Sequence, residues 1–306
     1  MNSIAILKEF GFYVAEEQES IYPFSPVYKL QDYIIKKTQY PLEKARKLVR
    51  YTKYLQEKGI PVVTPVSLTT SNPKQIEDAC YICYPFINGS HYQGTEKEII
   101  GAGELLGRIH ALSSSQNTFD LSDYNVFDFY HHEVDDHMKK ISDFVSIYQV
   151  NIPIQKLKDL LHTAVKNQEK LKKTSLKWVE TPHDYKANNL VFQSKPVLID
   201  PDNAVWIPRT FDLALALLLF HNEFPSAPDR TFTPKEWKLF LAGYLKHQIL
   251  TNTEIKAWEE TVLHVFLDEV MWLMAEVEED WERKEQRDLF VSVTETLFHI
   301  KDYPVY

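Results

Sequence analysis

Cysteine is nearly absent from this chain of 306 residues, which has only Cys80 and Cys83. Two cysteines cannot form a disulfide framework, which excludes the small disulfide-stapled class of proteins. A structural zinc site needs four ligands, and no second cysteine pair with matching spacing exists. We therefore expect both cysteines to behave as small apolar residues in a buried strand.

The chain also has few basic residues and no long apolar run. The 34 lysines and arginines are outnumbered by 43 acidic residues, and the net charge of −9 argues against nucleic acid as a partner. The longest apolar run, Leu213 to Phe220, covers about a third of a membrane span. The N-terminus meets charge at Lys8 and does not resemble a signal peptide. These features favour a cytoplasmic protein with neither a nucleic-acid nor a membrane partner.

Hydrophobic periodicity divides the chain into a strand-rich first part and a helix-rich second part, with a linker at Ile87-Asn-Gly89. Before the linker we expect helices at 4–10 and 42–58 and strands at 20–22, 27–31, 33–37, 60–66 and 79–85, with a polar turn at 72–78. After it we expect helices at 97–112, 134–148, 154–172, 211–220, 234–250, 253–281 and 287–299, and one hairpin of strands 190–192 and 197–199.

The residues that can carry chemistry gather around that hairpin. Asp184 lies just before it, Asn189 follows five residues later, and Asp200 ends its second strand. Magnesium-dependent phosphoryl transfer needs such a set, namely one group that accepts a hydroxyl proton and two oxygen ligands for the metal. Any one of these residues alone is explained as well by a polar turn before a hairpin. The joint pattern, with Asp200 closing the apolar frame Val197-Leu-Ile, favours catalysis.

Four stretches in the same order make the chain similar to the aminoglycoside phosphotransferase and choline kinase family. They are the catalytic block from Asp184 to Asp200, Tyr81-Ile-Cys-Tyr-Pro-Phe-Ile-Asn-Gly89, Leu106-Gly-Arg-Ile-His-Ala-Leu112 and Phe211-Asp-Leu-Ala214. The resemblance implies an α+β, two-lobed, protein-kinase-like fold. Residues 1–88 would form an N-terminal nucleotide-binding lobe, a small antiparallel sheet with one long helix. Residues 89–306 would form a larger, mostly helical lobe for catalysis and substrate binding.

The resemblance also implies roles for the catalytic block. Asp184 would be the catalytic base, and Lys186 would neutralise charge on the transferring phosphate. Asn189 and Asp200 would bind magnesium, and Asp212 would brace the loop. Asp202 lies where many relatives carry a second acid, which would either help the metal or face solvent. The family usually has histidine two residues before the catalytic aspartate. Here Pro182 holds that position and His183 is shifted by one, so we expect a structural role for His183.

The nucleotide site is less complete in the sequence. Lys36 follows an apolar triplet, as in the Val-Ala-Ile-Lys pattern, and is expected to bind the α- and β-phosphates of ATP; the alternative is an edge charge. The family's helix glutamate falls on the apolar Leu48, so Glu43 is the remaining candidate partner for Lys36. With only eight glycines there is no glycine-rich loop, and Ser25 is expected to serve instead. Adenine would lie against a hinge formed by Tyr84, Pro85, Phe86 and Ile87.

Two acidic stretches, Asp120 to Asp136 and Asp268 to Asp280, are candidates for binding the acceptor. With Trp272 and Trp281, the second suits an amine or a quaternary ammonium group; the alternative is a solvated helix face with core tryptophans. The spacing of the histidines at 131, 132 and 137 does not suit zinc. We therefore expect an ATP- and magnesium-dependent kinase, monomeric or homodimeric, for a hydroxyl of a small cationic molecule. An aminoglycoside antibiotic, with a role in resistance, or an amino alcohol such as choline would fit. The alternatives are a homoserine-type metabolite kinase and a catalytically silent nucleotide-binding relative.

Overall fold

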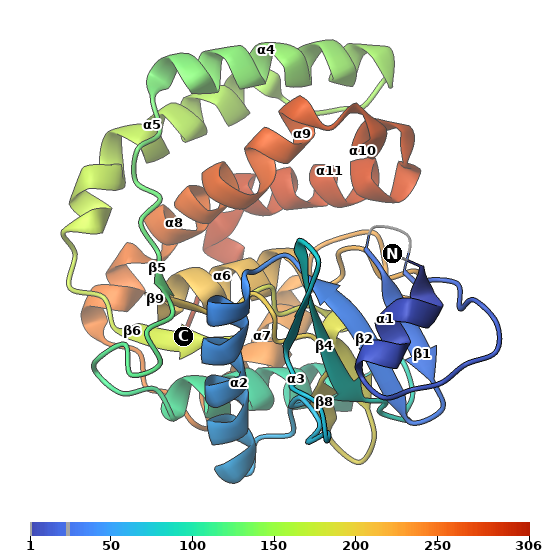
Figure 1. The fold of residues 1–306 in the computed structure, drawn as a ribbon. Helices are drawn as coiled ribbons and strands as arrows, with labels where there is room; N and C mark the ends of the chain where they lie inside the picture. The colour runs from blue at the N-terminus through green and yellow to red at the C-terminus, as the bar shows by residue number, and fades with distance from the viewer. Residues whose placement is uncertain (1, 23–24) are drawn as a thin grey trace.

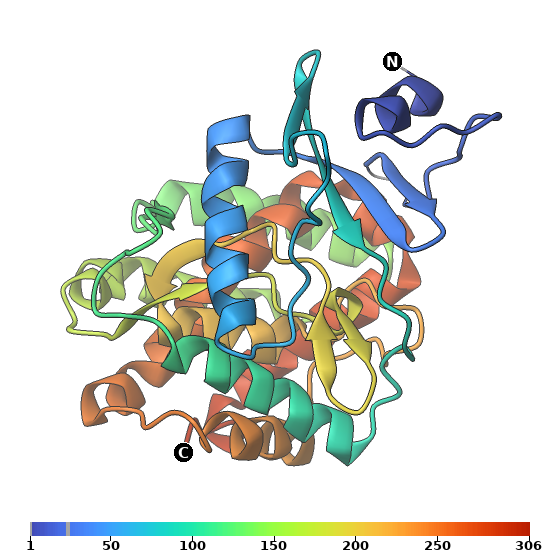
Figure 2. The same ribbon diagram turned by 60° about the horizontal axis from the view of Figure 1, so that its bottom comes forward.

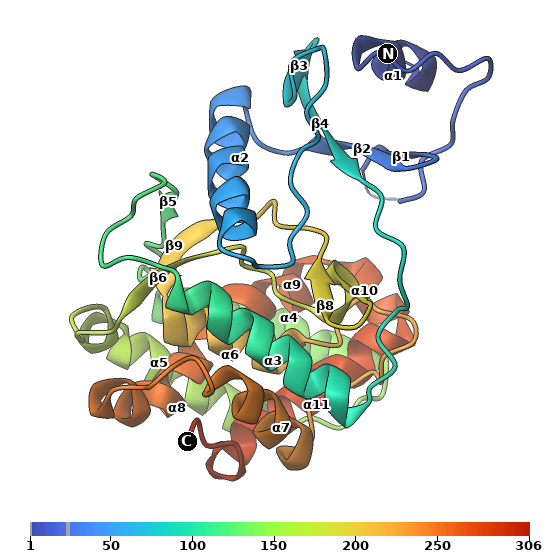
Figure 3. The same ribbon diagram turned by 90° about the horizontal axis from the view of Figure 1, so that it is seen from below.

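The computed structural model describes residues 2–22 and 25–306. An antiparallel sheet near the N-terminus and a larger body of helices lie on opposite sides of the molecule, as Figure 1 and Figure 3 show. One extended segment connects the sheet to the first helix of the larger body. This arrangement confirms the expected α+β fold, with a small sheet lobe and a mostly helical lobe.

The N-terminal sheet has four strands in the order β1-β2-β4-β3, and every neighbouring pair is antiparallel. Both cysteines lie buried in β4, as expected. Lys36 of β2 pairs with Ile82 of β4, while Ile34 pairs with Tyr84. Residues opposite each other share a face of the sheet, so Lys36 and Tyr84 point the same way. The strands are β1 Val27–Leu30, β2 Tyr33–Thr38, β3 Lys74–Ile76 and β4 Ala79–Pro85, and the short helix α1 Ser3–Glu9 precedes them.

Helix α2, Leu42–Glu57, runs beside the sheet and lies over the helical body (Figure 2). It is amphipathic, and its buried Leu48, Tyr51 and Leu55 belong to the core of the helical lobe. The hydroxyl of Tyr51 donates a hydrogen bond to the backbone oxygen of Glu180 at 2.9 Å. Ala45 packs on the other side against β4. The helix therefore holds the small sheet in place over the larger lobe.

The helical lobe begins at α3, Glu96–Ala111, which crosses α7, Pro234–Tyr244, at backbone contact distance. Glycines at 103, 107 and 243 make this crossing possible, because a Cβ on any of them would meet backbone atoms of the other helix within 2.5 Å. The remaining helices are α4 His131–Ile147, α5 Ile154–Lys172, α6 Arg209–Leu219, α8 Asn252–Phe266, α9 Trp272–Glu276, α10 Glu278–Glu282 and α11 Lys284–Phe298. Within the described residues, none of the helices is long and apolar enough to cross a membrane.

A hairpin of β7, Leu190–Phe192, and β8, Pro196–Leu198, lies between the two lobes (Figure 2). Val62, in the segment after α2, bridges to Leu198 in parallel, and the N–H of Val63 bonds to the oxygen of Leu198 at 2.9 Å. Three further strands, β5 Ser122–Asp123, β9 Val205–Pro208 and β6 Trp178–Thr181, pair in that order in a separate sheet. These contacts fix the loop that begins at Thr181 and the residues that follow Leu198.

Several sequence predictions are corrected by the structure. Residues 20–22 form bends rather than a strand, and 60–66 is extended with a single bridge, because Pro61 and Pro65 cannot donate to a ladder. Residues 72–78, expected as a polar turn, contain β3. The helix expected over 253–281 is interrupted by a π-helical stretch, Leu267–Met271, and a break at Val277. The helix expected over 234–250 ends at Tyr244. Strands β5, β6 and β9 were not predicted, since they are short and carry no alternating pattern.

Candidate active site

The loop between β6 and β7 turns sharply at two consecutive residues. His183 has a φ of 56° and Asp184 a φ of 44°, a left-handed conformation that residues other than glycine seldom adopt. The amide of Asn189 donates to the backbone oxygen of Asp184 at 2.8 Å and holds this turn. The short 3₁₀ turn Ala187–Asn189 then leads into β7. Such strain persists only where the surroundings enforce it, and it is common at active sites.

Asp184 lies in a half-buried position beside a cation. The ammonium of Lys186 is 3.2 Å from Oδ2 of Asp184 and 2.9 Å from Oε2 of Glu223. Burial raises the pKa of Asp184 above its ordinary value, while Lys186 and His183 oppose that rise. Burial alone would lower the pKa of Lys186, but Asp184 and Glu223 outweigh it and raise that pKa. Asp184 therefore has a charged lysine as its immediate partner and lines a cavity.

Asn189 and Asp200 lie next to each other because the N–H of Ile199 bonds to the backbone oxygen of Asn189 at 2.9 Å. The Asn189 amide is oriented by Asp184, and its Oδ1 accepts no hydrogen bond from any described residue. The side chain of Asp200 is 40% exposed. Magnesium is held in proteins by one or two carboxylates plus phosphate oxygens, so one amide oxygen and one open carboxylate fit it. The described residues contain no cluster of three acidic, histidine or cysteine side chains that could hold a metal ion.

Lys36 extends from β2 to the same region. Its Nζ lies 2.7 Å from Oδ1 of Asp200 and 2.9 Å from Oδ2 of Asp202. Burial would lower the pKa of Lys36, but Asp202 and Asp200 together raise it. The hydroxyl of Tyr84 donates to the other oxygen of Asp202 at 2.8 Å. Lys36 is thus an internal ion-pair partner and not an edge charge.

Glu43 does not pair with Lys36, which corrects the expected lysine–glutamate pair. The Glu43 carboxylate bonds to Arg46 one helical turn away at 2.6 Å, and its side chain is 79% exposed. Helix α2 turns its apolar face, which includes Leu48, toward the interior, and Glu43 lies on the opposite side. Among the described residues, the ion-pair partners of Lys36 are both aspartates from the segment after β8.

Asp212, near the start of α6, organises a buried hydrogen-bond network beneath the loop. Its Oδ2 is 2.9 Å from both Nε2 of His110 and the hydroxyl of Thr181, and its Oδ1 is 3.0 Å from Nδ1 of His183. Burial would raise the pKa of Asp212, but the two histidines hold it far below its ordinary value. His183 therefore reaches the buried acid despite its shift by one residue, and Thr181 adds a second donor.

Sequence reasoning missed Thr181 and Glu223, and it placed Glu269 only in an acidic stretch proposed for the acceptor, not beside His183. Glu269 lies in the π-helical stretch, 3.4 Å from Nε2 of His183. Burial alone would lower the pKa of His183, but hydrogen bonds to Asp212 and Glu269 raise it to about 10. Glu223 comes from the turn after α6, far from the loop in sequence. No local pattern marks these residues, because only chain packing brings them to the loop.

Some backbone groups of the proposed hinge and phosphate loop already form hydrogen bonds within the protein. Pro85 has no N–H, and the N–H of Phe86 bonds to the oxygen of Asp32 at 2.7 Å. The N–H of Ile87 makes no backbone hydrogen bond within the described residues. Ser25 is partly buried, and its backbone oxygen accepts from the hydroxyl of Ser20 at 3.1 Å. Pro23 and Phe24 of the expected phosphate loop lie outside the described residues.

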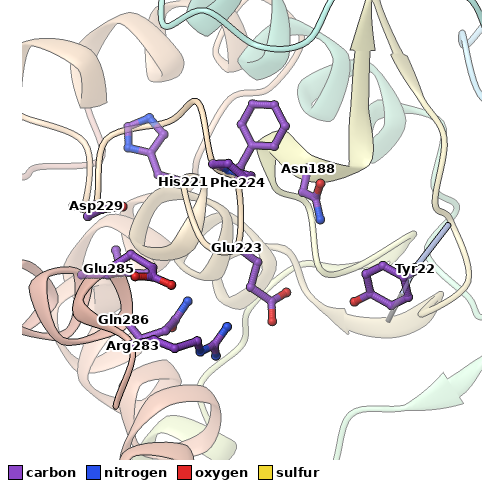
Figure 4. Close-up of a pocket in the computed structure, with 11 residues that line it drawn as sticks. Tyr22, Asn188, His221, Glu223, Phe224, Asp229, Arg283, Glu285 and Gln286 are labelled. Carbon is purple, nitrogen blue, oxygen red and sulfur yellow. The ribbon is translucent and has the colours of Figure 1, made fainter. Parts of the chain in front are cut away.

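Two cavities flank the catalytic loop. One, of about 350 Å³, is lined by His183, Asp184 and Glu269 together with Tyr40 and Lys44 of the small lobe. The other, of about 410 Å³, lies between the turn after α6 and the start of α11 (Figure 4). Its carboxylates are Glu223, Asp229 and Glu285, and its arginine, Arg283, is already bonded to Asp280.

Several residues of the two acidic stretches that were proposed to bind the acceptor are paired with other protein groups instead. Trp281 is fully buried against Phe144 and Tyr148, and Glu276 is bonded to Lys140, so the far end of the second stretch is structural. Asp120 of the first stretch is bonded to Lys47 on α2. His131 pairs with His162 rather than with a ligand set. The beginning of the second stretch reaches the catalytic loop at Glu269, and Ser122 of the first stretch lines the same cavity as Asp184.

The chain matches a known protein family. The model of the phosphotransferase enzyme family matches residues 25–250. A search of curated proteins finds no match.

Three solved structures have a similar fold. A spectinomycin phosphotransferase in complex with ADP and spectinomycin has 17% identity and a TM-score of 0.59, covering 98% of this chain and 97% of its own. An amicoumacin kinase in complex with AMP-PNP and Ca²⁺ has 13% identity and a TM-score of 0.64, covering 98% and 94%. A choline kinase from Cryptosporidium parvum has 14% identity and a TM-score of 0.52, covering 94% and 91%. The family match spans most of the chain, including every residue of the catalytic loop, and the chain belongs to the phosphotransferase enzyme family.

Proposed function

We propose that this chain transfers the γ-phosphoryl group of ATP, with magnesium, to a hydroxyl group of a small cationic molecule. The observation that carries the proposal is the position of Asp184, which lies beside Lys186 and is joined through Asn189 to Asp200. A base, a charge that neutralises phosphate, and two metal-binding oxygens thus share one loop and one strand end. Phosphoryl transfer depends mainly on such positioning and charge stabilisation.

The proposed roles follow from this geometry. Magnesium ATP supplies the phosphoryl group when bound, and Asn189 and Asp200 would hold the metal. Asp184 orients the acceptor hydroxyl and takes its proton as the new oxygen–phosphorus bond forms and the bond to ADP breaks. Lys186 then faces the charge that develops on the transferred group, while Lys36 would bind the α- and β-phosphates.

The nucleotide would bind between a small lobe, residues 1–88, and a catalytic lobe, residues 89–306. Of Pro85, Phe86 and Ile87, only Ile87 has an N–H with no backbone partner in the described chain, so it is the donor we assign to adenine. Ser25 would cover the phosphates. Two buried, free cysteines fit a reducing compartment, where ATP is also available.

Three carboxylates on the cavity of Figure 4, with Glu269 in the other cavity, support a cationic acceptor. Aminoglycoside-type antibiotics and amino alcohols both combine an ammonium group with a hydroxyl group. Relatives of similar fold include kinases of both kinds, a spectinomycin phosphotransferase and a choline kinase. The panel of acceptors should therefore contain spectinomycin, gentamicin, choline, aminopropanol and, as a less cationic option, homoserine.

The test is acceptor-dependent release of ADP by the wild-type chain and by Asp184→Ala and Asp184→Asn. We expect turnover to fall about 100- to 10,000-fold, because the base is lost, with ADP affinity nearly unchanged. Asp143→Asn, an exposed change on α4, is the matched control. Full activity in the Asp184 variants would refute the assignment. Nucleotide binding by the wild type with no ADP release for any acceptor would favour a silent binding protein.

A further inference from the structure

Asp202 and Asp200 differ in whether their carboxylate oxygens are free to bind a ligand. Asp202 is 8% exposed; one of its oxygens accepts a hydrogen bond from the Tyr84 hydroxyl at 2.8 Å, and the other forms an ion pair with the Lys36 ammonium at 2.9 Å. Asp200 is far more exposed and meets Lys36 through one oxygen only. One aspartate is therefore open to a ligand from the cleft, while the other is enclosed by protein.

The sheet register explains why Tyr84 and Lys36 meet the same carboxylate. They lie on one face of adjacent strands, two positions apart on the diagonal, and both side chains extend toward the segment after β8. That segment is tied to the small lobe through Leu198, which bonds to Pro61 and Val63 at 2.9 Å. The three residues thus form one chain from the hinge strand to the phosphate-binding lysine.

Helix α2 offers no competing partner. Leu48 is buried in the core, and Glu43 is exposed and bonded to Arg46. A lysine that binds phosphates needs a fixed carboxylate behind it, because a free ammonium samples many rotamers. In this chain that carboxylate comes from the strand end and not from the helix.

We infer that Asp202, braced by the Tyr84 hydroxyl, is the positioning residue that aims Lys36 at the nucleotide phosphates, while Asp200 alone of the two faces the metal. The inference rests on the proposed function, since it presumes that a nucleotide binds beside Lys36. Asp202 acts through Lys36 and need not contact the nucleotide. Tyr84 contributes indirectly, because its hydroxyl holds Asp202 in place.

Two titrations separate this role from that of a second metal ligand. The affinity for ADP is measured by calorimetry in EDTA, and the midpoint of magnesium activation is measured by turnover. We expect Asp202→Asn to weaken magnesium-free ADP binding roughly tenfold, as loss of an orienting partner does, and to leave the magnesium midpoint unchanged. Asp200→Asn should shift the magnesium midpoint, because Asp200 is the aspartate that faces the metal. Tyr84→Phe should follow Asp202→Asn with a smaller effect, and it keeps the test valid if Asp202→Asn folds poorly. Glu43→Gln is the matched control and should alter neither quantity.

A shifted magnesium midpoint with unchanged magnesium-free affinity in Asp202→Asn would overturn the inference and make Asp202 a metal ligand. The apo protein provides an independent reading through amine-directed labelling of Lys36, followed by mass spectrometry. Asp202→Asn should speed the labelling of Lys36, and an unchanged rate overturns the inference. If the wild type binds no nucleotide, the proposed function fails, while the labelling rates still decide whether Asp202 holds Lys36.

Discussion

The ammonium of Lys186 lies 3.2 Å from Oδ2 of Asp184 and 2.9 Å from Glu223, so it joins the proposed base to the wall of a cavity. Both carboxylates and the lysine come from turns rather than from regular elements. This relationship gives the first two predictions.

The pH profile should depend on Lys186. Burial raises the pKa of Asp184, and Lys186 lowers it. Catalysis by the ionised carboxylate is lost as the pH falls through that pKa. Lys186→Met removes the opposing charge, so the acidic limb of kcat/KM should move to higher pH. Lys53→Met, an exposed change on α2, should leave the limb in place. An unchanged limb in Lys186→Met would show that Asp184 does not govern it.

Glu223 should contribute to acceptor binding. Its carboxylate lines the cavity of Figure 4 and is partly exposed. Glu223→Gln should raise the KM for a cationic acceptor roughly tenfold, because a charged partner is lost, and should change the KM for ATP little. Steady-state kinetics with both substrates measures this. Glu282→Gln on α10 is the control, since Glu282 is exposed and does not line the cavity. Equal effects on both KM values would argue against an acceptor site here.

The charge on His183 should make stability fall with pH. The pKa of His183 is raised from 6.5 to about 10, chiefly by Asp212 and Glu269 acting against burial. Between these values the folded chain holds a proton that the unfolded chain releases. The resulting stabilisation is complete below pH 6.5 and is lost as the pH rises through about 10. Urea unfolding at several pH values measures this slope, which His183→Asn should reduce. An equal slope in both proteins would contradict the assignment.

The crossing of α3 and α7 should tolerate no side chain at Gly103. A Cβ there would lie 2.0 Å from the backbone oxygen of Phe240, which cannot move without shifting the helix. Gly103→Ala should therefore destabilise the fold by about 1 to 3 kcal/mol. Gly101→Ala is the matched control, since its Cβ would lie 3.4 Å from the ring of Pro196. Thermal unfolding of the two variants compares them, and equal melting temperatures would contradict the packing argument.

Strong local patterns were the predictable part of this molecule. The long helices could be recognised because each has many residues that agree on one periodicity. The two-lobed class and the role of the short hairpin followed from the resemblance of the catalytic block and three other stretches to a known family. The short strands β5, β6 and β9 could not, because two to four residues contain too little pattern. The π-helical stretch that carries Glu269 interrupts a helix whose sequence remains amphipathic on both sides, so its position was also hidden.

The sequence by itself determined the order and spacing of Asp184, Asn189 and Asp200, because a short hairpin leaves little freedom in where these side chains lie. Tertiary structure alone decided the distant partners of Lys36 and Asp212. Lys36 meets Asp200 across 164 residues of chain, and His110 meets Asp212 across 102. Burial makes an unpaired charge costly, so each group binds the opposite charge that packing brings nearest. That physical requirement gave Lys36 two aspartates in place of Glu43, and it brought the shifted His183 to Asp212.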